Sequence, residues 1–449
     1  MQIFSFKKFL KEQFILLSLS AIVGILSALF IAFFLKLLEA ATAYRNSHFQ
    51  LLFLLPIAGW VIYLSYQYLG KNSSKGNNLI IKEAKGNQES VPAVMLPLVL
   101  FGTVITHLFG GSAGREGTAV QIGGTVAAKI SEWCKLNQQL RSILLICGIG
   151  AGFSAVFGTP LTGFVFSLEV LVIGKMEYKA APYSLIASLI ANYFCLQLGI
   201  HHTKYFITSS IPMNGEWISI ALKVGIASIG FGLAGYLFSY FIELFKKIYS
   251  KILPKAWMIP IFGGIIIIIL GQWLVGKDYL GLGVDPNYPG AASIVGAFHA
   301  GGSFTWSWFW KLLFTTITLS AGFKGGEVTP LFFIGAALGN TLATLFNIPI
   351  DLLAGVGFIA VFAAATNTPL ACTMMGIELF GAANLPFFAI GCFVAYYCSG
   401  HSGIYTSQNI GIAKNSFLQI RNNKLLSQHL SQKELFYHKK WTLVKNKYL

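Results

Sequence analysis

Long stretches without a charged side chain constrain this protein more than any other feature of its sequence. No Asp, Glu, Lys or Arg occurs from Phe14 to Leu35, from Val91 to Gly114 or from Trp257 to Gly276. About 20 apolar residues in a helix cross the ~30 Å hydrocarbon core of a bilayer. Only 11% of all residues are charged, less than half of the ~25% typical of soluble domains. We therefore predict an all-α integral membrane protein that crosses the lipid bilayer several times, with these three stretches as membrane helices.

The first stretch has a second possible reading, a cleaved signal peptide. Its apolar run is longer than the ~7–15-residue core of such peptides, and no small-residue cleavage site follows it before Lys36. We expect the segment to be retained.

The net charge of +16 allows two explanations, a nucleic-acid partner or the topology of a membrane protein. The cations gather in short loops and at the chain ends, and Glu434 is the only acidic residue in the segment 421–449. Lys and Arg near membrane helices are enriched on the cytoplasmic side. We therefore expect both termini to be cytoplasmic at the cell (plasma) membrane and no binding of nucleic acid. The predicted organisation is a transmembrane domain over 1–420 and a basic cytoplasmic tail over 421–449, with no soluble regulatory domain.

An internal repeat divides the membrane part into related halves. The segment from Gly148 to Leu161 resembles the segment from Gly357 to Leu370, and both end in Thr-Pro-Leu. Ser112-Ala113-Gly114 precedes Ser320-Ala321-Gly322 at nearly the same offset. Two matches at nearly one offset indicate duplication, which is common in transporters. The periodicity alone does not decide whether the two copies are parallel or inverted.

The halves lie at about 75–200 and 285–410. Apolar runs within them are short and interrupted by Gly and Pro, as from Leu331 to Phe346 and from Leu352 to Thr366. Such lengths predict tilted or half-crossing helices. Broken helices at membrane depth are tolerated where they are buried in protein or line a polar cavity, which is where transporters hold their substrates.

Charged residues within the membrane part are informative because each costs ~2.5–3.5 kcal/mol on insertion scales. The few that occur are Arg115 and Glu116 in the Gly-rich segment 110–118, Lys324 and Glu327 in the Gly-rich segment 320–330, and the repeat carboxylates Glu169 and Glu378. Each Gly-rich segment precedes an apolar helix, whose free N–H groups favour anions. Two such helix ends that converge near the midplane would form a weak, reversible halide site.

Glu116 combines two properties at one of these helix ends. Its carboxylate could occupy the anion site and leave it on protonation, which would make it both a gate and a proton carrier. The alternative is that Arg115 and Glu116 simply pair in a loop. For Glu169 and Glu378 we expect a structural role as buried carboxylates that accept backbone N–H bonds.

Two functions from other classes are weaker alternatives. Gly110-Gly-Ser112-Ala-Gly114 fits the G-x-S-x-G pattern of hydrolases, and Gly400-His-Ser402-Gly403 fits the shorter G-x-S-G. A nucleophile also needs a base within hydrogen-bond reach, but the only histidines after Ser402 are His429 and His438 in the polar tail, and no H-E-x-x-H occurs. The six cysteines include no C-x-x-C pair, so neither a metal site nor another cofactor is expected. We therefore do not expect an enzyme. A transporter of organic solutes on another fold is a remote alternative, because the polar residues here cluster at helix ends.

Several motifs together resemble the CLC family of voltage-gated chloride channels and proton-coupled anion exchangers. Gly114-Arg-Glu-Gly117 is similar to the family's G-[KR]-E-G-P motif, with Glu116 in the place of its gating glutamate. The other matches are Gly76-Asn-Asn-Leu79 for G-S-G-I-P, Gly326-Glu-Val-Thr-Pro330 for G-x-F-x-P, and Gly403-Ile-Tyr405 for the anion-coordinating tyrosine. The similarity runs from about residue 15 to 420. It implies a CLC-type fold of two inverted repeats with broken helices, a pore within each subunit, and a homodimer.

Departures from the family pattern refine this resemblance. Asn77 replaces the coordinating serine, Thr118 the proline after the glutamate and Val328 the phenylalanine, while Val170 stands where chloride/proton exchangers have an inner proton glutamate. This combination is similar to the fluoride-exporting branch, whose members couple fluoride to protons without the inner glutamate. We therefore predict a fluoride/proton antiporter that exports fluoride. A chloride channel or chloride/proton antiporter of the same family is the alternative.

The resemblance and the residues together define a candidate site. Glu116 is the predicted gate and proton acceptor. The predicted contacts to fluoride or chloride, through side chains or backbone amides, are Asn77, Gly114, Arg115, Gly117, Thr118, Glu327, Val328, Thr329 and Tyr405.

Overall fold

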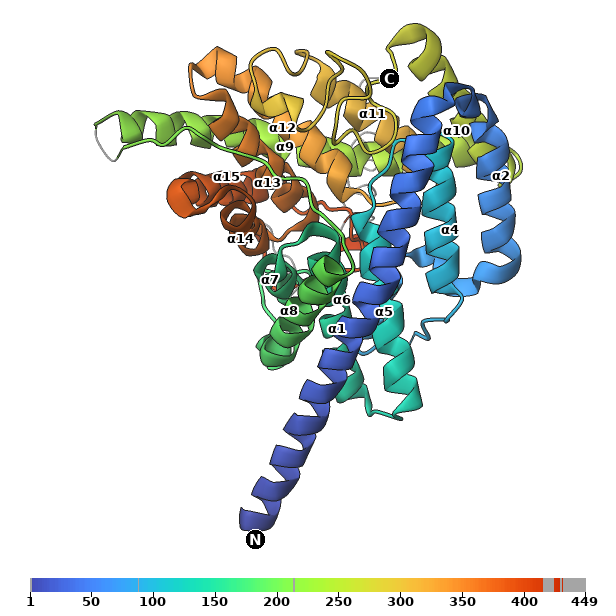
Figure 1. Ribbon diagram of the computed structural model, residues 1–449, viewed down its shortest axis with the longest axis vertical. Coiled ribbons are helices and arrows are strands. Elements are labelled where there is room, and N and C mark those ends of the chain that lie inside the picture. Colours follow the sequence, from blue (N-terminus) through green and yellow to red (C-terminus); the bar gives the residue numbers. More distant parts are fainter. Residues whose placement is uncertain (1, 88, 213–214, 415–423, 429, 431–449) are drawn as a thin grey trace, which may run out of the picture.

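The computed structural model describes residues 2–87, 89–212, 215–414, 424–428 and 430, almost all of them in helices and their connections (Figure 1). The helices are α1 Gln2–Ser47, α2 Leu55–Ser65, α3 Asn77–Ala84, α4 Met95–Leu108, α5 Glu116–Trp133, α6 Gln138–Phe157, α7 Pro160–Glu169, α8 Ala181–Gln197, α9 Gly215–Ile252, α10 Met258–Ile269, α11 Ser307–Ser320, α12 Val328–Phe346, α13 Ile350–Thr366, α14 Pro369–Phe380 and α15 Leu385–Cys398. The strands are β1 Val172–Ile173, β2 Asn409–Ile410 and β3 Lys424–Leu425.

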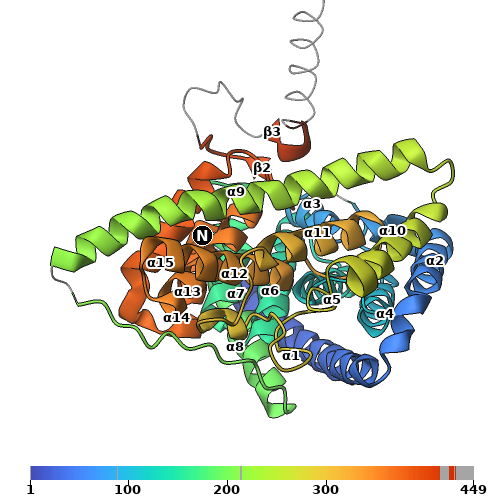
Figure 2. The ribbon, with the colours of Figure 1, turned by 90° about the horizontal axis from the view of Figure 1, so that it is seen from above.

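Long and short apolar helices are mixed, as the broken apolar runs predicted. Within the described residues five helices are long and apolar enough to cross a membrane: Leu10–Ser47, Phe49–Gly70, Gln138–Phe157, Gly215–Ile252 and Val328–Phe346. Figure 1 shows the N-terminal end of α1 extending beyond the other helices, and Figure 2 shows α9 along one side of the bundle. The fold class of an all-α membrane protein is therefore confirmed.

The three predicted membrane stretches differ in how closely they match the helices of the structure. Phe14 to Leu35 lies entirely within α1, and the stretch that begins at Trp257 forms α10 with a π-helical extension, Leu270–Leu274. The prediction of one helix from Val91 to Gly114 is wrong at its ends, because α4 covers only Met95–Leu108. The chain turns after α4, where Gly110 adopts a φ of 84° that suits glycine.

The duplication detected in the sequence reappears as paired helix crossings. In the first half a Cβ on Gly123 of α5 would lie 2.2 Å from the carbonyl oxygen of Gly148 on α6. In the second half a Cβ on Gly335 of α12 would lie 2.0 Å from the carbonyl oxygen of Gly357 on α13. Only glycine permits such close backbone approach, so both halves use the same small-residue packing.

The two halves are inverted relative to each other. Glu169 at the end of α7 accepts hydrogen bonds from the first turn of α14, and Glu378 near the end of α14 accepts hydrogen bonds from the first turn of α7. The C-terminal end of each helix therefore lies against the N-terminal end of its counterpart, so these repeat-related helices are antiparallel. This arrangement resolves the orientation that sequence periodicity left open.

A small sheet connects the first half to the end of the described chain. β1 pairs in parallel with β2, and β2 pairs antiparallel with β3. The segment between Tyr405 and β2 is thereby fixed next to the end of α7. Most of the predicted basic tail over 421–449 lies outside the described residues.

Candidate functional site

The two Gly-rich segments meet through their backbones. The Gly114 N–H donates to the Gly326 carbonyl at 2.6 Å, and the Gly326 N–H donates to the Gly114 carbonyl at 2.7 Å. A Cβ on Gly326 would lie 2.7 Å from the Gly117 nitrogen and 2.9 Å from the Glu116 nitrogen. The loop before α12 therefore rests directly on the N-terminus of α5, and only glycine fits at this contact. The predicted convergence of two helix N-termini is present in the structure.

Glu116 lies where these helix ends converge. It is the first residue of α5 and is 1% exposed. Its carboxylate accepts hydrogen bonds from the Arg115 N–H and the Thr329 N–H, both at 3.1 Å, and from the Thr329 hydroxyl. The Arg115 Nε lies 3.9 Å from the carboxylate, which is long for an ion pair. The carboxylate is therefore held mainly by backbone and hydroxyl donors at the helix ends, as an anion would be.

A cavity of about 500 Å³ opens on one side of this junction. We call it the Tyr405 cavity; its lining includes Asn77, Gln121, Lys324, Glu327 and Tyr405. A Cβ on Gly117 would lie 3.0 Å from Asn77 Nδ2 and 3.4 Å from Glu327 Oε2. Two polar side chains of the cavity therefore meet at the N-terminus of α5. Asn77 Oδ1 and Glu327 Oε2 are buried and have no hydrogen-bond partner among the described residues.

A much smaller chamber of about 20 Å³ lies on another side of the junction. We call it the His202 chamber; its lining is Arg115, Glu116, Val156, Phe157, His202, Thr203, Tyr205, Val284, Thr329, Phe332, Phe358 and Leu379. It shares no lining residue with the Tyr405 cavity. Glu116 and Thr329 thus border one space, while Glu327 borders the other. The junction of the two helix ends separates the two spaces.

The predicted site residues divide into two groups. Glu116, Gly117, Thr329, Asn77 and Glu327 come together at the junction, and Tyr405 lines the cavity beside them. Tyr405 is 3% exposed.

Three other predicted contacts are occupied or turned away. The Gly114 N–H is already bonded to Gly326, so it is not free for an anion in this conformation. The Thr118 hydroxyl pairs with the Thr103 hydroxyl at 2.7 Å and faces α4. Val328 is buried and lines neither space. The reason is geometric, because successive residues of a helix point in different directions and only some can face the junction.

Two residues near the site had no assigned role in the sequence analysis. Lys324 Nζ lies 4.2 Å from the centre of the Tyr66 ring, and both residues line the Tyr405 cavity. Its position in an apolar region was a usable signal, because an intramembrane cation is costly. His202 gave no such signal, since it lies in a polar loop between α8 and α9.

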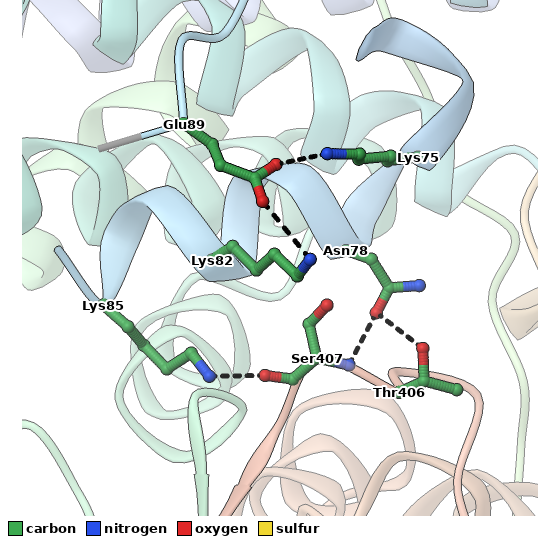
Figure 3. A network of polar contacts seen from close by, with 7 residues as sticks. All are labelled: Lys75, Asn78, Lys82, Lys85, Glu89, Thr406 and Ser407. Atoms are coloured by element: carbon green, nitrogen blue, oxygen red, sulfur yellow. Dashed lines mark hydrogen bonds and ion pairs between the residues drawn. The ribbon is translucent and has the colours of Figure 1, made fainter. Parts of the chain in front are cut away.

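A polar network fastens α3 to the loop that follows Tyr405 (Figure 3). Asn78 Oδ1 accepts from the Ser407 N–H at 2.9 Å and from the Thr406 hydroxyl at 3.5 Å. Lys85 Nζ donates to the Ser407 carbonyl at 2.5 Å. Because Asn77 and Tyr405 are direct neighbours of these residues in the chain, the network fixes both side chains at the Tyr405 cavity.

The same face of α3 carries an ion-pair cluster that adjoins this network. Lys75 and Lys82 contact opposite oxygens of Glu89, at 2.7 and 3.3 Å (Figure 3). The hydrogen bond from Lys75 holds the pKa of the Glu89 carboxyl below its usual range. The cluster joins the start and the end of α3 to the loop before α4.

Comparison with known proteins gives consistent matches. A family model described as voltage gated chloride channel matches residues 57–400. A chloride/fluoride channel protein of Pseudomonas syringae pv. tomato is 42% identical over 406 residues, which cover 89% of this chain and 87% of the relative. An H(+)/Cl(-) exchange transporter of Vibrio cholerae is 24% identical, with 82% of each chain covered. The crystal structure of a CLC-type fluoride/proton antiporter matches with a TM-score of 0.82 and 38% identity over 88% of this chain and 97% of that one.

Proposed function

The chain belongs to the voltage-gated chloride channel family, and from this premise we propose that it is a fluoride/proton antiporter that exports fluoride across the cell membrane. One observation carries the proposal. The Glu116 carboxylate occupies the junction of two helix N-termini between the Tyr405 cavity and the His202 chamber. A site that holds a carboxylate in this way is an anion site, and the occupant is itself able to bind a proton.

Proton coupling follows from competition for this site. A charged Glu116 carboxylate accepts from Thr329 and excludes another anion from the same donors. Protonation removes its charge, so its attraction to the helix ends falls and an anion takes its place. The anion then leaves when the carboxylate loses its proton and returns. Each exchange of occupant thus links one anion step to one proton step.

Fluoride as the anion is favoured by the donors at the junction. Fluoride is small and strongly hydrated, so a site that selects it must supply close, strong donors in place of water. The Thr329 N–H and hydroxyl, which bind Glu116 in this conformation, become free when the carboxylate leaves. Asn77 adds its Nδ2 amide at the first turn of α5. The fluoride/proton antiporter is 38% identical and the chloride/fluoride channel protein 42%, against 24% for the chloride exchanger. Chloride transport is the second candidate.

Glu327 supplies a second carboxylate on the path of the proton. It lines the Tyr405 cavity, and its Oε2 is buried without a hydrogen-bond partner among the described residues. Val170 is apolar and buried, so it does not supply the proton acceptor that exchangers resembling this chain have there. We assign to Glu327 the exchange of protons between the Tyr405 cavity and the junction.

Orientation and assembly complete the proposal. We place the Tyr405 cavity on the cytoplasmic side, because Lys75 and Lys246 line it and cations are enriched on that side. The proposed homodimer would use α7, α8, α14 and α15, which carry exposed apolar side chains. These are Leu161, Leu189, Leu196, Leu370, Leu385 and Phe393.

The test is flux through the purified protein in liposomes. Vesicles loaded with fluoride are diluted into fluoride-free buffer, and fluoride efflux and proton uptake are recorded together. We expect fluoride to leave faster than chloride does under the same conditions, and protons to be driven inward against their gradient. Chloride flux equal to or above fluoride flux would support the second candidate. Fluoride efflux without uphill proton movement would indicate a channel.

A further inference from the structure

The His202 chamber has room for very little. Its volume of about 20 Å³ is just above the ~10–15 Å³ that one water molecule requires. Among its lining residues, His202 Nε2 and Arg115 Nε are buried atoms without a hydrogen-bond partner among the described residues. These two atoms and the Glu116 carboxylate are three polar groups of the lining, and a buried water usually makes two to four hydrogen bonds. The chamber therefore has room for one water molecule, and both His202 and Glu116 line it.

The His202 ring is seated by the shape of the neighbouring backbone. Gly158 ends α6 with a φ of +73°, and a Cβ at this position would lie 2.4 Å from the His202 Cδ2. Any other residue would therefore displace the ring. The loop that carries His202 is also fixed, because Asp351 accepts from the N–H groups of Thr208 and Ser209 at 2.7 and 2.9 Å and from both hydroxyls. The His202 ring is thus packed against Gly158, and its loop is anchored further along at Thr208 and Ser209.

The surroundings keep this imidazole neutral. Burial, followed by the positive charge of Arg115, lowers the pKa of His202 to about 4, and a hydrogen bond with the Val156 backbone opposes this only partly. His201 acts in the same direction as Arg115. A neutral imidazole has a free ring nitrogen that can accept a proton, whereas a permanent imidazolium has none.

Besides its chain neighbour His201, the charged and titratable groups around His202 are those that line the chamber. Arg115 and Glu116 face it from the start of α5, and Tyr205 faces it from its own loop. The lining residues from α6, α12, α13 and α14 are Val156, Phe157, Thr329, Phe332, Phe358 and Leu379, and none of them titrates. Among the lining residues, Glu116 is therefore the one proton acceptor that His202 can serve.

We propose that His202 is the proton-transfer group through which protons reach Glu116 from the His202 chamber. This inference rests on the proposed proton-coupled transport. A hydronium ion or buffer acid outside the chamber gives its proton to the imidazole. The imidazolium then passes one proton through the chamber water to a Glu116 carboxylate oxygen. The imidazole returns to its neutral form, the water is unchanged, and the neutral carboxylic acid is released from the Thr329 donors.

The experiment compares His202→Ala with His201→Ala in the liposome assay. His201 is the exposed neighbour, so its replacement controls for general effects on the loop. We expect His202→Ala to slow coupled fluoride and proton flux roughly tenfold, below the ~10²–10⁴ of a full acid–base group because solvent can still deliver some protons. Added imidazole should restore the flux, because a free base can occupy the vacated space. His201→Ala should transport at the normal rate with or without imidazole.

Two outcomes would overturn the inference: His202→Ala flux equal to that of the unmodified protein, or slow flux that imidazole leaves unchanged. Should the alanine variant fail to fold, His202→Asn keeps a polar side chain that cannot take up a proton. The expected result for this variant is slow flux that rises with buffer concentration. A rate independent of buffer would overturn the proposal in this variant. The unmodified protein tests the premise separately, since uncoupled fluoride flux there would refute the proposed function itself.

Discussion

Two pairs of helix N-termini in this molecule are related by the same repeat, yet they use carboxylates differently. At the α7/α14 pair the relation is reciprocal. Glu378 accepts from the Leu161 and Thr162 N–H groups at 2.9 and 2.7 Å, and Glu169 accepts from the Leu370 and Ala371 N–H groups at 3.1 and 2.8 Å. Each helix start thus receives one carboxyl group from its counterpart.

At the α5/α12 pair a single carboxylate serves both helix starts. Glu116 accepts from the Arg115 N–H before α5 and from the Thr329 N–H in α12. It also borders the His202 chamber, whereas Glu169 and Glu378 border neither that chamber nor the Tyr405 cavity. Reciprocal capping by carboxylates that border neither space makes a fixed joint. In the proposed mechanism, the single shared carboxylate beside the His202 chamber makes a joint whose occupant is exchanged.

Replacing the exchangeable carboxylate should have the largest effect. Glu116→Gln fills the same space but cannot carry a proton at neutral pH, so we expect proton uptake driven by a fluoride gradient to disappear. Uphill proton movement is measured with a pH electrode in the liposome assay. Proton pumping that persists in this variant would mean that Glu116 does not carry the proton, and that the α5/α12 joint is as fixed as the α7/α14 joint.

Replacing a fixed carboxylate should affect stability and leave coupling unchanged. Glu169→Gln turns one acceptor into an amide donor that faces the backbone N–H of Leu370 or Ala371. A buried donor left unsatisfied costs ~1–3 kcal/mol, so the midpoint of thermal unfolding in detergent should fall. Glu378→Gln is the matched variant from the other repeat and should behave alike.

The ratio of protons to fluoride should stay the same in both of these variants. A changed ratio with normal stability would mean that the α7/α14 joint also takes part in transport. The α7/α14 joint and the α5/α12 joint would then not differ in function.

The donors at the exchangeable joint should determine anion preference. Asn77→Ser replaces an amide donor beside Gly117 with a shorter hydroxyl. One hydrogen bond contributes ~0.5–1.5 kcal/mol, so the ratio of fluoride to chloride flux should narrow about two- to tenfold. The ratio is measured with ion-selective electrodes in parallel liposome preparations. An unchanged ratio would mean that Thr329 and the backbone N–H groups at the helix ends determine the anion preference without Asn77.

The sequence predicted the helical membrane fold, the repeat and the place of Glu116 at a helix start because each depends on local composition or a short motif. Glu169 and Glu378 accept backbone N–H bonds as expected, but only Glu169 is buried, and their partners were not predicted. Each contacts the opposite repeat, and a pairing between distant segments leaves no local pattern. The ends of α4 were missed because an uncharged run continues past Leu108 into the loop. His202 was missed because its role depends on a chamber built from several helices and loops.

Replacing Tyr405 should have the smallest effect, because this residue lines the cavity named after it but belongs to neither joint. Its ring packs edge-on to Phe166, with ring centroids 6.5 Å apart, and the residue lines the cavity. Tyr405→Phe keeps this packing and removes one O–H donor from the path of the anion. At ~0.5–1.5 kcal/mol for a hydrogen bond, fluoride flux should change less than about tenfold while proton coupling persists. Loss of coupling in this variant would mean that the Tyr405 hydroxyl carries the proton, and the exchangeable joint would then include the cavity as well as Glu116.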